Sequence, residues 1–122
     1  MAYNHFDIPI FQKAYDLYKL IYSYRNTVPK SDRYTIWKKN EECSLILIEL
    51  LLQANQVNGS EKLSLLNQVS NKIDLLRILI RLAHDIKNID QKKYLNLQSN
   101  LDEIGRMLGG WMKNIRTKHS NM

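Results

Sequence analysis

Hydrophobic residues recur at the spacing of an α-helix in several stretches of this chain. The first stretch predicts a helix over residues 9–26, because Pro9 suits a helix start and Pro29 disfavours helical backbone at the residue before it. We expect its apolar face to combine an aromatic line with an aliphatic line. The face consists of Phe11, Tyr15, Tyr18 and Tyr22, with Ile10, Ala14, Leu17 and Ile21 beside them.

The second and third stretches predict helices over residues 35–56 and 61–87. Thr35 and Ser60 are the expected N-caps, since short hydroxyl side chains satisfy free backbone N–H groups at helix starts. Residues 29–34 form a polar corner with room for one helical turn, and Gly59 suits a left-handed turn between the two helices.

A fourth helix is predicted after Asp90, its expected N-cap, and continues to Arg116 or Lys118. Its inward stripe is expected to run unbroken past Gly109 and Gly110. The stripe consists of Tyr94, Leu97, Leu101, Ile104, Leu108, Trp111 and Ile115. Gly105 and Gly109 share one face, a spacing that would allow another backbone to approach closely.

Four long helices joined by short loops predict an all-α fold, an antiparallel up-down-up-down four-helix bundle. We expect residues 1–122 to form this single domain, with a disordered polar tail over about residues 117–122.

The third helix has more apolar surface than a bundle core needs. Its apolar residues cover about 220° of the helical circumference. They are Ile73, Leu75, Leu76, Ile78, Leu79, Ile80, Leu82, Ala83 and Ile86. Part of this arc would be exposed on a monomer, which favours self-association into a homo-oligomer, with a different protein partner as the alternative.

The charge balance changes the picture of possible partners. The 122 residues carry 18 basic and 12 acidic side chains, a net charge of +6. Five of the six excess positive charges lie in residues 59–122. Such a balance favours polyanions through counterion release, although it also serves solubility alone. The single cysteine, Cys43, lies in an apolar run, which is typical of a buried thiol. The sequence shows neither an apolar segment long enough to span a membrane nor a signal segment. We therefore expect a cytoplasmic protein without a membrane segment.

Candidate chemistry is sparse. His5, His84 and His119 are far apart and belong to no ligand-spaced cluster, so we expect no metal, no cofactor and no catalytic residues. His84 beside Asp85 is typical of a solvated helix face. Elsewhere in the chain, residues 38–42 contain two lysines followed by two glutamates, which we interpret as charge pairing on a helix surface.

Arg77 and Arg81 are the most informative charges, because they stand one helical turn apart in an otherwise apolar segment. One interpretation pairs Arg77 with Asp74 and Arg81 with Asp85. The other is a guanidinium fork for phosphates or partner carboxylates, which Lys72 and His84 would extend.

A second basic cluster lies near the C-terminus: Arg106, Lys113, Arg116 and Lys118. Cations there suit the helix dipole, and they could also hold a phosphate backbone. Because the aromatic residues are expected on core stripes, no base-stacking platform is predicted. Binding of RNA or DNA would therefore use phosphate contacts with weak sequence specificity.

Three segments resemble a known family: PKSDRYT at 29–35, LLRILIRLA at 75–83 and DEIGRMLGGW at 102–111. They are similar to the accessory variability determinant (Avd) proteins of diversity-generating retroelements and to the related four-helix-bundle proteins encoded in intervening sequences of rRNA genes. The resemblance implies a homopentameric barrel with a basic surface. It also implies a non-enzymatic partner of a reverse transcriptase, with Arg77 and Arg81 matching the arginine pair implicated in binding that enzyme.

Two functions follow from these patterns. The first is a retroelement accessory protein that binds the reverse transcriptase and nucleic acid (RNA or cDNA) during mutagenic retrohoming. The second is a protein of the rRNA intervening-sequence branch, which the first residues, 6–13, also resemble, acting as an oligomeric scaffold of unknown role.

Overall fold

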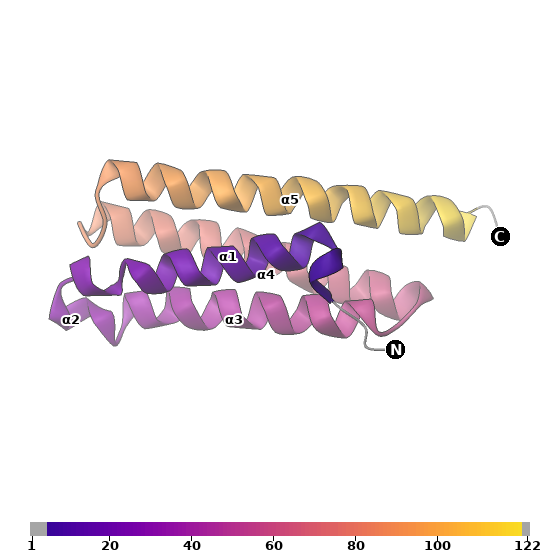
Figure 1. Cartoon of the computed structure of the whole chain (residues 1–122), viewed down its shortest axis with the longest axis horizontal. Helices are drawn as coiled ribbons and strands as arrows, with labels where there is room; N and C mark the ends of the chain where they lie inside the picture. The colour runs from indigo at the N-terminus through magenta and orange to yellow at the C-terminus, as the bar shows by residue number, and fades with distance from the viewer. Residues whose placement is uncertain (1–4, 121–122) are drawn as a thin grey trace.

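The structure is a computed structural model that describes the backbone of residues 5–120 and the side chains of residues 6–116. Within this part of the chain the long helices are α1 (Pro9–Ser23), α3 (Ile36–Asn55), α4 (Gly59–Asp85) and α5 (Gln91–Ser120). Shorter elements are the 3-10 turns η1 (His5–Asp7) and η2 (Arg25–Thr27) and the one-turn helix α2 (Lys30–Arg33). The long helices run up, down, up and down side by side, as predicted (Figure 1).

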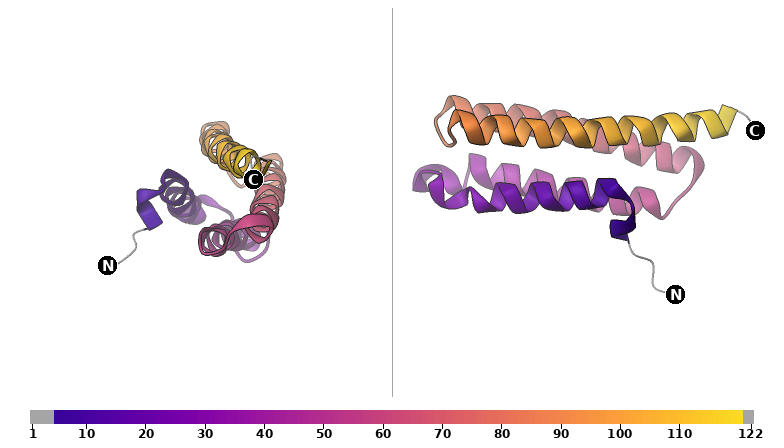
Figure 2. Two further views of the ribbon diagram at one scale, coloured as in Figure 1. Left: turned by 90° about the vertical axis from the view of Figure 1, so that its right-hand side faces the viewer. Right: turned by 45° about the horizontal axis from the view of Figure 1, so that its top comes forward.

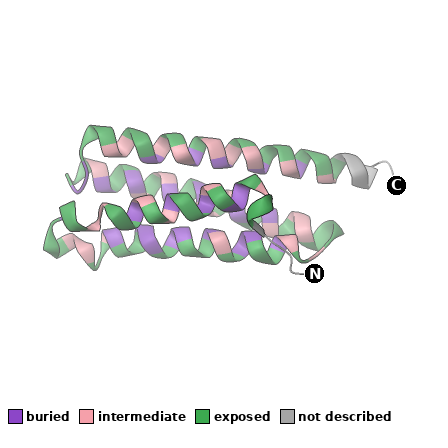
Figure 3. Ribbon diagram, viewed as in Figure 1, coloured by how far each residue is buried: buried purple, intermediate pink, exposed green. Residues whose placement is uncertain are grey.

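Helices α1 and α4 occupy diagonally opposite corners of the bundle, because each packs against both α3 and α5. The end view in Figure 2 shows this square arrangement, with α1 and α4 on opposite sides. Apolar residues from all four long helices form one buried core. Figure 3 shows buried positions recurring along the helices. The largest fully buried side chain is Trp37, whose indole N–H donates to the Ile21 carbonyl at 3.2 Å and ties α3 to α1.

The aromatic line of α1 does not lie in the core as predicted. Tyr15 is 44% exposed and Tyr22 is 53% exposed, whereas Leu17 and Ile21 are fully buried. The core face of α1 is the aliphatic line together with Phe11, because these residues are buried where α1 packs against its two neighbouring helices.

One predicted helix start is confirmed and one needs correction. Thr35 is the N-cap residue of α3, as predicted, but its hydroxyl donates back to the Ser31 and Asp32 carbonyls and forms no capping hydrogen bond. Helix α4 begins at Gly59, so the N-cap is Asn58 and the predicted cap Ser60 lies inside the first turn. Gly59 has the expected left-handed backbone, with φ of +62°.

The corner between α4 and α5 is closed by backbone hydrogen bonds. The Asn88 N–H donates to Ala83 O at 2.8 Å and the Lys87 N–H donates to His84 O at 3.0 Å. This pair of bonds is the Schellman arrangement, which places one residue in left-handed backbone. Here that residue is Lys87, with φ of +68°, so α4 ends two residues before the predicted boundary.

Helix α5 confirms its predicted cap and its continuity. Asp90 Oδ1 accepts a hydrogen bond from the Lys93 N–H at 2.9 Å. The helix passes through Gly109 and Gly110 without a break and continues to Ser120, beyond the predicted end. Its last turns project past the α3–α4 turn (Figures 1 and 2). The last two residues of the expected tail, 121–122, lie outside the described residues.

Candidate nucleic-acid and partner interface

Arg77 lies between α4 and α5 and pairs with a residue that the sequence analysis did not select. Its Nη1 donates to Asp102 Oδ1 of α5, in place of the predicted partner Asp74. Gly105 stands beside it, since a Cβ there would lie 3.4 Å from Arg77 Nη2. This is an ordinary van der Waals distance, so Gly105 packs against a side chain, where the sequence analysis expected the close approach of another backbone. Gly109 has nothing within 4 Å of an added Cβ among the described residues.

Arg81, one turn further along α4, is in a different environment. Its side chain is 75% exposed, against 34% for Arg77. It pairs with Asp85, as predicted, but at the long distance of 4.0 Å between Nε and Oδ2. The two arginines thus differ in how far they are available, with Arg77 engaged by α5 and Arg81 presented to solvent.

Lys72 does not join these arginines. It lies close enough to Cys43 of α3 for its charge to lower the pKa of that thiol, although burial raises this pKa more strongly. Lys72 is therefore on the α3 side of α4, whereas Arg77 is on the α5 side. Cys43 is 5% exposed, which confirms the predicted buried thiol.

His84 is also on the α5 side, but it is not the solvated group that the sequence suggested. Its imidazole stacks on the Tyr94 ring with 4.4 Å between centroids and 18° between planes. Its Nδ1 lies 3.8 Å from Asp85 Oδ1. The stacking holds the imidazole at the corner between α4 and α5.

The C-terminal cations Arg106, Lys113 and Arg116 are all exposed on α5. Their spacing of seven and three residues keeps them on one side of the helix. Lys118, the remaining member of the predicted cluster, lies outside the residues whose side chains are described. Arg106 is in the turn next to Gly105, so the cluster begins near Arg77 and extends along the projecting end of α5.

The structure also shows a charge pair that the sequence analysis missed. Glu41, interpreted as a partner of the neighbouring lysines, is 6% exposed and accepts two hydrogen bonds from Arg25, at 2.8 and 2.9 Å. These bonds raise the pKa of Arg25, while burial opposes the shift. The predicted surface pairing holds only for Glu42, which lies 3.9 Å from Lys38 and 3.8 Å from Lys39. Because the two partners are on different helices, sequence spacing carried no signal for the Arg25 pair.

Comparison with known families adds the decisive observation. A model of the bAvd-like family matches residues 9–115, which is nearly all of the bundle. The chain belongs to the bAvd-like family. Among curated proteins no sequence matches it.

This Avd-like chain exposes apolar residues on α4 and α1, the helices at diagonally opposite corners of the bundle, and on α3 between them. On α4, the predicted excess is confirmed, since Leu75, Ile78, Leu82 and Ile86 are between 39% and 65% exposed at spacings of three and four residues. The other exposed apolar residues of this half of the chain include Phe6 in η1, Tyr15 and Tyr22 on α1, and Leu45, Ile46 and Leu52 on α3. The α1 tyrosines also face cations, with Lys19 Nζ 5.4 Å from the Tyr15 ring and Arg25 Cζ 4.7 Å from the Tyr22 ring.

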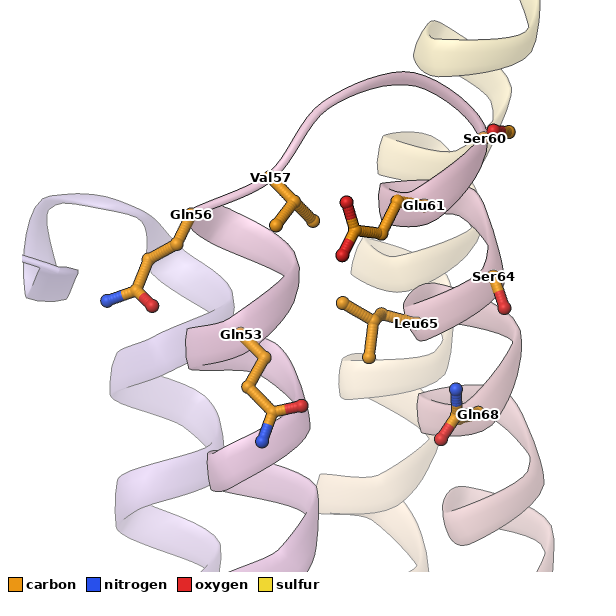
Figure 4. Close-up of a pocket in the computed structure, with 8 residues that line it drawn as sticks. All are labelled: Gln53, Gln56, Val57, Ser60, Glu61, Ser64, Leu65 and Gln68. Atoms are coloured by element: carbon orange, nitrogen blue, oxygen red, sulfur yellow. The ribbon is translucent and has the colours of Figure 1, made fainter.

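The cleft beside the α3–α4 turn has few side chains that could take part in catalysis or metal binding. It is lined largely by amides and serines, with Gln53, Glu61 and Leu65 pointing into the gap between the helices (Figure 4). Among the described residues that line it, Glu61 alone is titratable. Within the described residues no three His, Cys, Asp or Glu side chains are grouped so that they could hold a metal ion. In the same part of the chain no helix combines the length and the apolar character needed to cross a bilayer.

Proposed function

We propose that this protein is a cytoplasmic, non-enzymatic accessory protein of a diversity-generating retroelement, which binds the reverse transcriptase and RNA or cDNA during mutagenic retrohoming. The observation that carries the proposal is the bAvd-like match over residues 9–115. The exposed cations of α5 and the exposed Arg81 support it, because they supply contacts for a phosphate backbone and for an acidic protein partner.

We further propose that copies of the chain associate head to tail into a closed ring, a homopentamer by the resemblance to Avd proteins. The exposed apolar side chains of α4 are aliphatic, whereas those of α1 are aromatic, and these two helices stand at diagonally opposite corners of the bundle. Two different surfaces on separate helices fit a heterologous interface, which generates a ring when the rotation closes. A ring would repeat the basic end of α5 around one axis and strengthen its field.

The test is a titration of labelled RNA with the protein at several salt concentrations. If phosphate contacts dominate, the logarithm of affinity falls linearly with the logarithm of salt concentration, by about 0.7 per phosphate neutralised on a single strand. Replacing Arg106, Lys113 and Arg116 together by glutamine should reduce that slope. Replacing Lys30, which is exposed at the far end of the bundle on α2, is the matched control and should leave the slope unchanged.

An affinity that does not depend on salt, or no binding of any RNA, would contradict nucleic-acid binding. Ring formation without RNA binding would favour the scaffold role of the rRNA intervening-sequence branch, since the two apolar surfaces support assembly whether or not a polyanion is bound.

A further inference from the structure

An open pocket of about 430 Å³ lies where the start of α1, the end of α3 and the start of α4 meet α5. Its walls are mainly apolar, and the apolar side chains that line it are Ile8, Pro9, Ile10, Met107 and Trp111. Binding pockets in proteins have this character, with volumes of roughly 300–1,000 Å³ and a few polar groups among apolar ones. The pocket includes neither the exposed α5 cations nor the exposed apolar residues of α1, α3 and α4 described above.

Helix α5 supplies one wall of this pocket. Met107, Gly110, Trp111 and Asn114 line it, and their spacing places all four on one face of the helix. Met107 and Trp111 are half-buried, so both can be reached from the pocket. An indole ring and a thioether each interact favourably with a second aromatic ring. This wall therefore favours an aromatic occupant.

Gly110 leaves helix backbone exposed in the middle of the wall. Because it has no side chain, a flat ring can lie against the helix between Met107 and Asn114. A Cβ added at position 110 would have nothing within 4 Å among the described residues. A larger side chain here would therefore take up open space at the pocket without displacing other parts of the bundle.

Lys62 is the one charged side chain among the described residues that line the pocket. Its Nζ lies 5.5 Å from the centroid of the Trp111 ring. The nearby carboxylates are directed elsewhere, since Glu61 points into the gap between α3 and α4 (Figure 4) and Glu103 lies 3.2 Å from Lys13. The positive charge of Lys62 is thus not neutralised within the pocket, and it favours an anionic group beside an aromatic one.

We propose that this pocket binds an aromatic side chain of a protein partner, in a segment whose neighbouring residues are acidic. Aromatic side chains that fill pockets carry much of the binding energy at protein interfaces. The carboxylates beside the aromatic residue meet Lys62, and such charge complementarity selects the partner. Pro9 and Asn114 are exposed at the pocket, so the side chain enters while the backbone of the segment stays outside. This role goes beyond the proposed function, because it requires neither RNA nor a ring.

The experiment is calorimetric titration with a blocked peptide, acetyl-Asp-Glu-Phe-Asp-Glu-amide, together with NMR detection of the Trp111 indole N–H. We expect saturable binding that shifts this signal, whereas the signal of Trp37, which is fully buried in the core, stays in place. Alanine in place of the phenylalanine should weaken binding at least about tenfold, because the aromatic anchor is lost. No saturable shift at millimolar peptide, or equal affinity for the two peptides, would overturn the proposal.

Two glycine variants locate the binding in the pocket. Gly110→Leu adds a side chain at the pocket and should reduce peptide affinity at least about tenfold. Gly109→Leu, which adds the same side chain at a position that does not line the pocket, is the matched control and should leave affinity unchanged. Both variants should remain folded, because each position has space for a Cβ and leucine is a better helix former than glycine. Equal affinities of the two variants would contradict the assigned pocket.

A second pair of variants tests the charge. Lys62→Gln should weaken binding of the acidic peptide several-fold, and the loss should shrink at high salt as the charges are screened. Lys92→Gln removes the same charge from an exposed position near the start of α5 and should have no effect. If both changes weaken binding equally, the peptide responds to net charge alone and the proposal fails.

The outcome can be separated from that of the proposed function. RNA titrations report on the α5 cations, whereas peptide titrations report on the pocket, so a protein that binds no RNA should still bind the peptide. The triple variant of Arg106, Lys113 and Arg116 should bind the peptide as the unmodified chain does. Loss of peptide binding in this variant would overturn the proposal, because the exposed cations would then be holding the acidic peptide.

Discussion

The two sides of α4 use the same residue types for opposite purposes. Ile80 faces the core and is fully buried, whereas Ile78, two positions earlier, is 65% exposed. Arg77 is drawn to Asp102 of α5, while Arg81 extends outward. Helix α4 thus packs within the bundle on one side and exposes apolar and basic side chains on the other, which is the side that we propose for partners. Whether an isoleucine of α4 is buried or exposed, and whether an arginine pairs with α5 or faces solvent, depends on its angle around the helix and not on its residue type.

The largest effect is expected from core truncation on α4. Ile80→Ala should lower the free energy of unfolding by about 2–5 kcal/mol, because it removes buried atoms and leaves a cavity. Ile78→Ala is the matched control, and it should change the unfolding free energy of the isolated protomer by less than about 0.5 kcal/mol. Urea denaturation at low protein concentration compares the two. A similar loss for both variants would show that the exposed side of α4 also packs within the protomer.

The next effect concerns assembly. Ile78→Glu combined with Leu82→Glu places charges on the exposed stripe, so self-association should weaken by at least about tenfold, or 1.4 kcal/mol. Sedimentation at micromolar concentration measures the shift toward 14.4 kDa, the mass of one chain. Helical circular dichroism should remain unchanged. An assembly that survives this double change would place its interface on another surface.

The smallest effects separate the two arginines. Arg77→Ala should cost about 0.2–1 kcal/mol of unfolding free energy, because its ion pair with Asp102 is partly exposed to solvent. Arg81→Ala should leave stability within about 0.5 kcal/mol but reduce co-purification of the reverse transcriptase. Thermal denaturation and affinity capture of the enzyme provide the two readouts. Reduced capture from Arg77→Ala alone would show that this arginine leaves α5 to meet the partner.

Much of the bundle could be predicted because local signals decide it. Pro9, Gly59 and Asp90 mark boundaries through backbone geometry and capping, and the structure confirms all three. Ser60 was wrong because several polar residues in the α3–α4 turn could serve as the cap, and Asn58 precedes the helix instead. Lys87 carried no signal for a left-handed turn, since that position usually belongs to glycine.

The candidate site was less predictable than the fold. Sequence spacing placed Arg77 and Arg81 one turn apart on a helix, but it assigned Asp74 as the partner of Arg77. The real partner, Asp102, is 25 residues away. Lys72 was grouped with the arginines, although it lies toward α3. A helical wheel gives the angle of each residue, but it does not say which helix stands at that angle.

By itself the sequence determined the helices, their order and the excess of apolar and positive surface, because periodicity, capping and charge are properties of neighbouring residues. Only the tertiary structure decided which aromatic side chains of α1 remain exposed, which arginine is engaged and that the Asn88 side-chain amide is buried with no hydrogen-bond partner among the described residues. These outcomes depend on contacts between segments that are distant in the sequence. The packing of whole helices settles such contacts, and no local pattern encodes them.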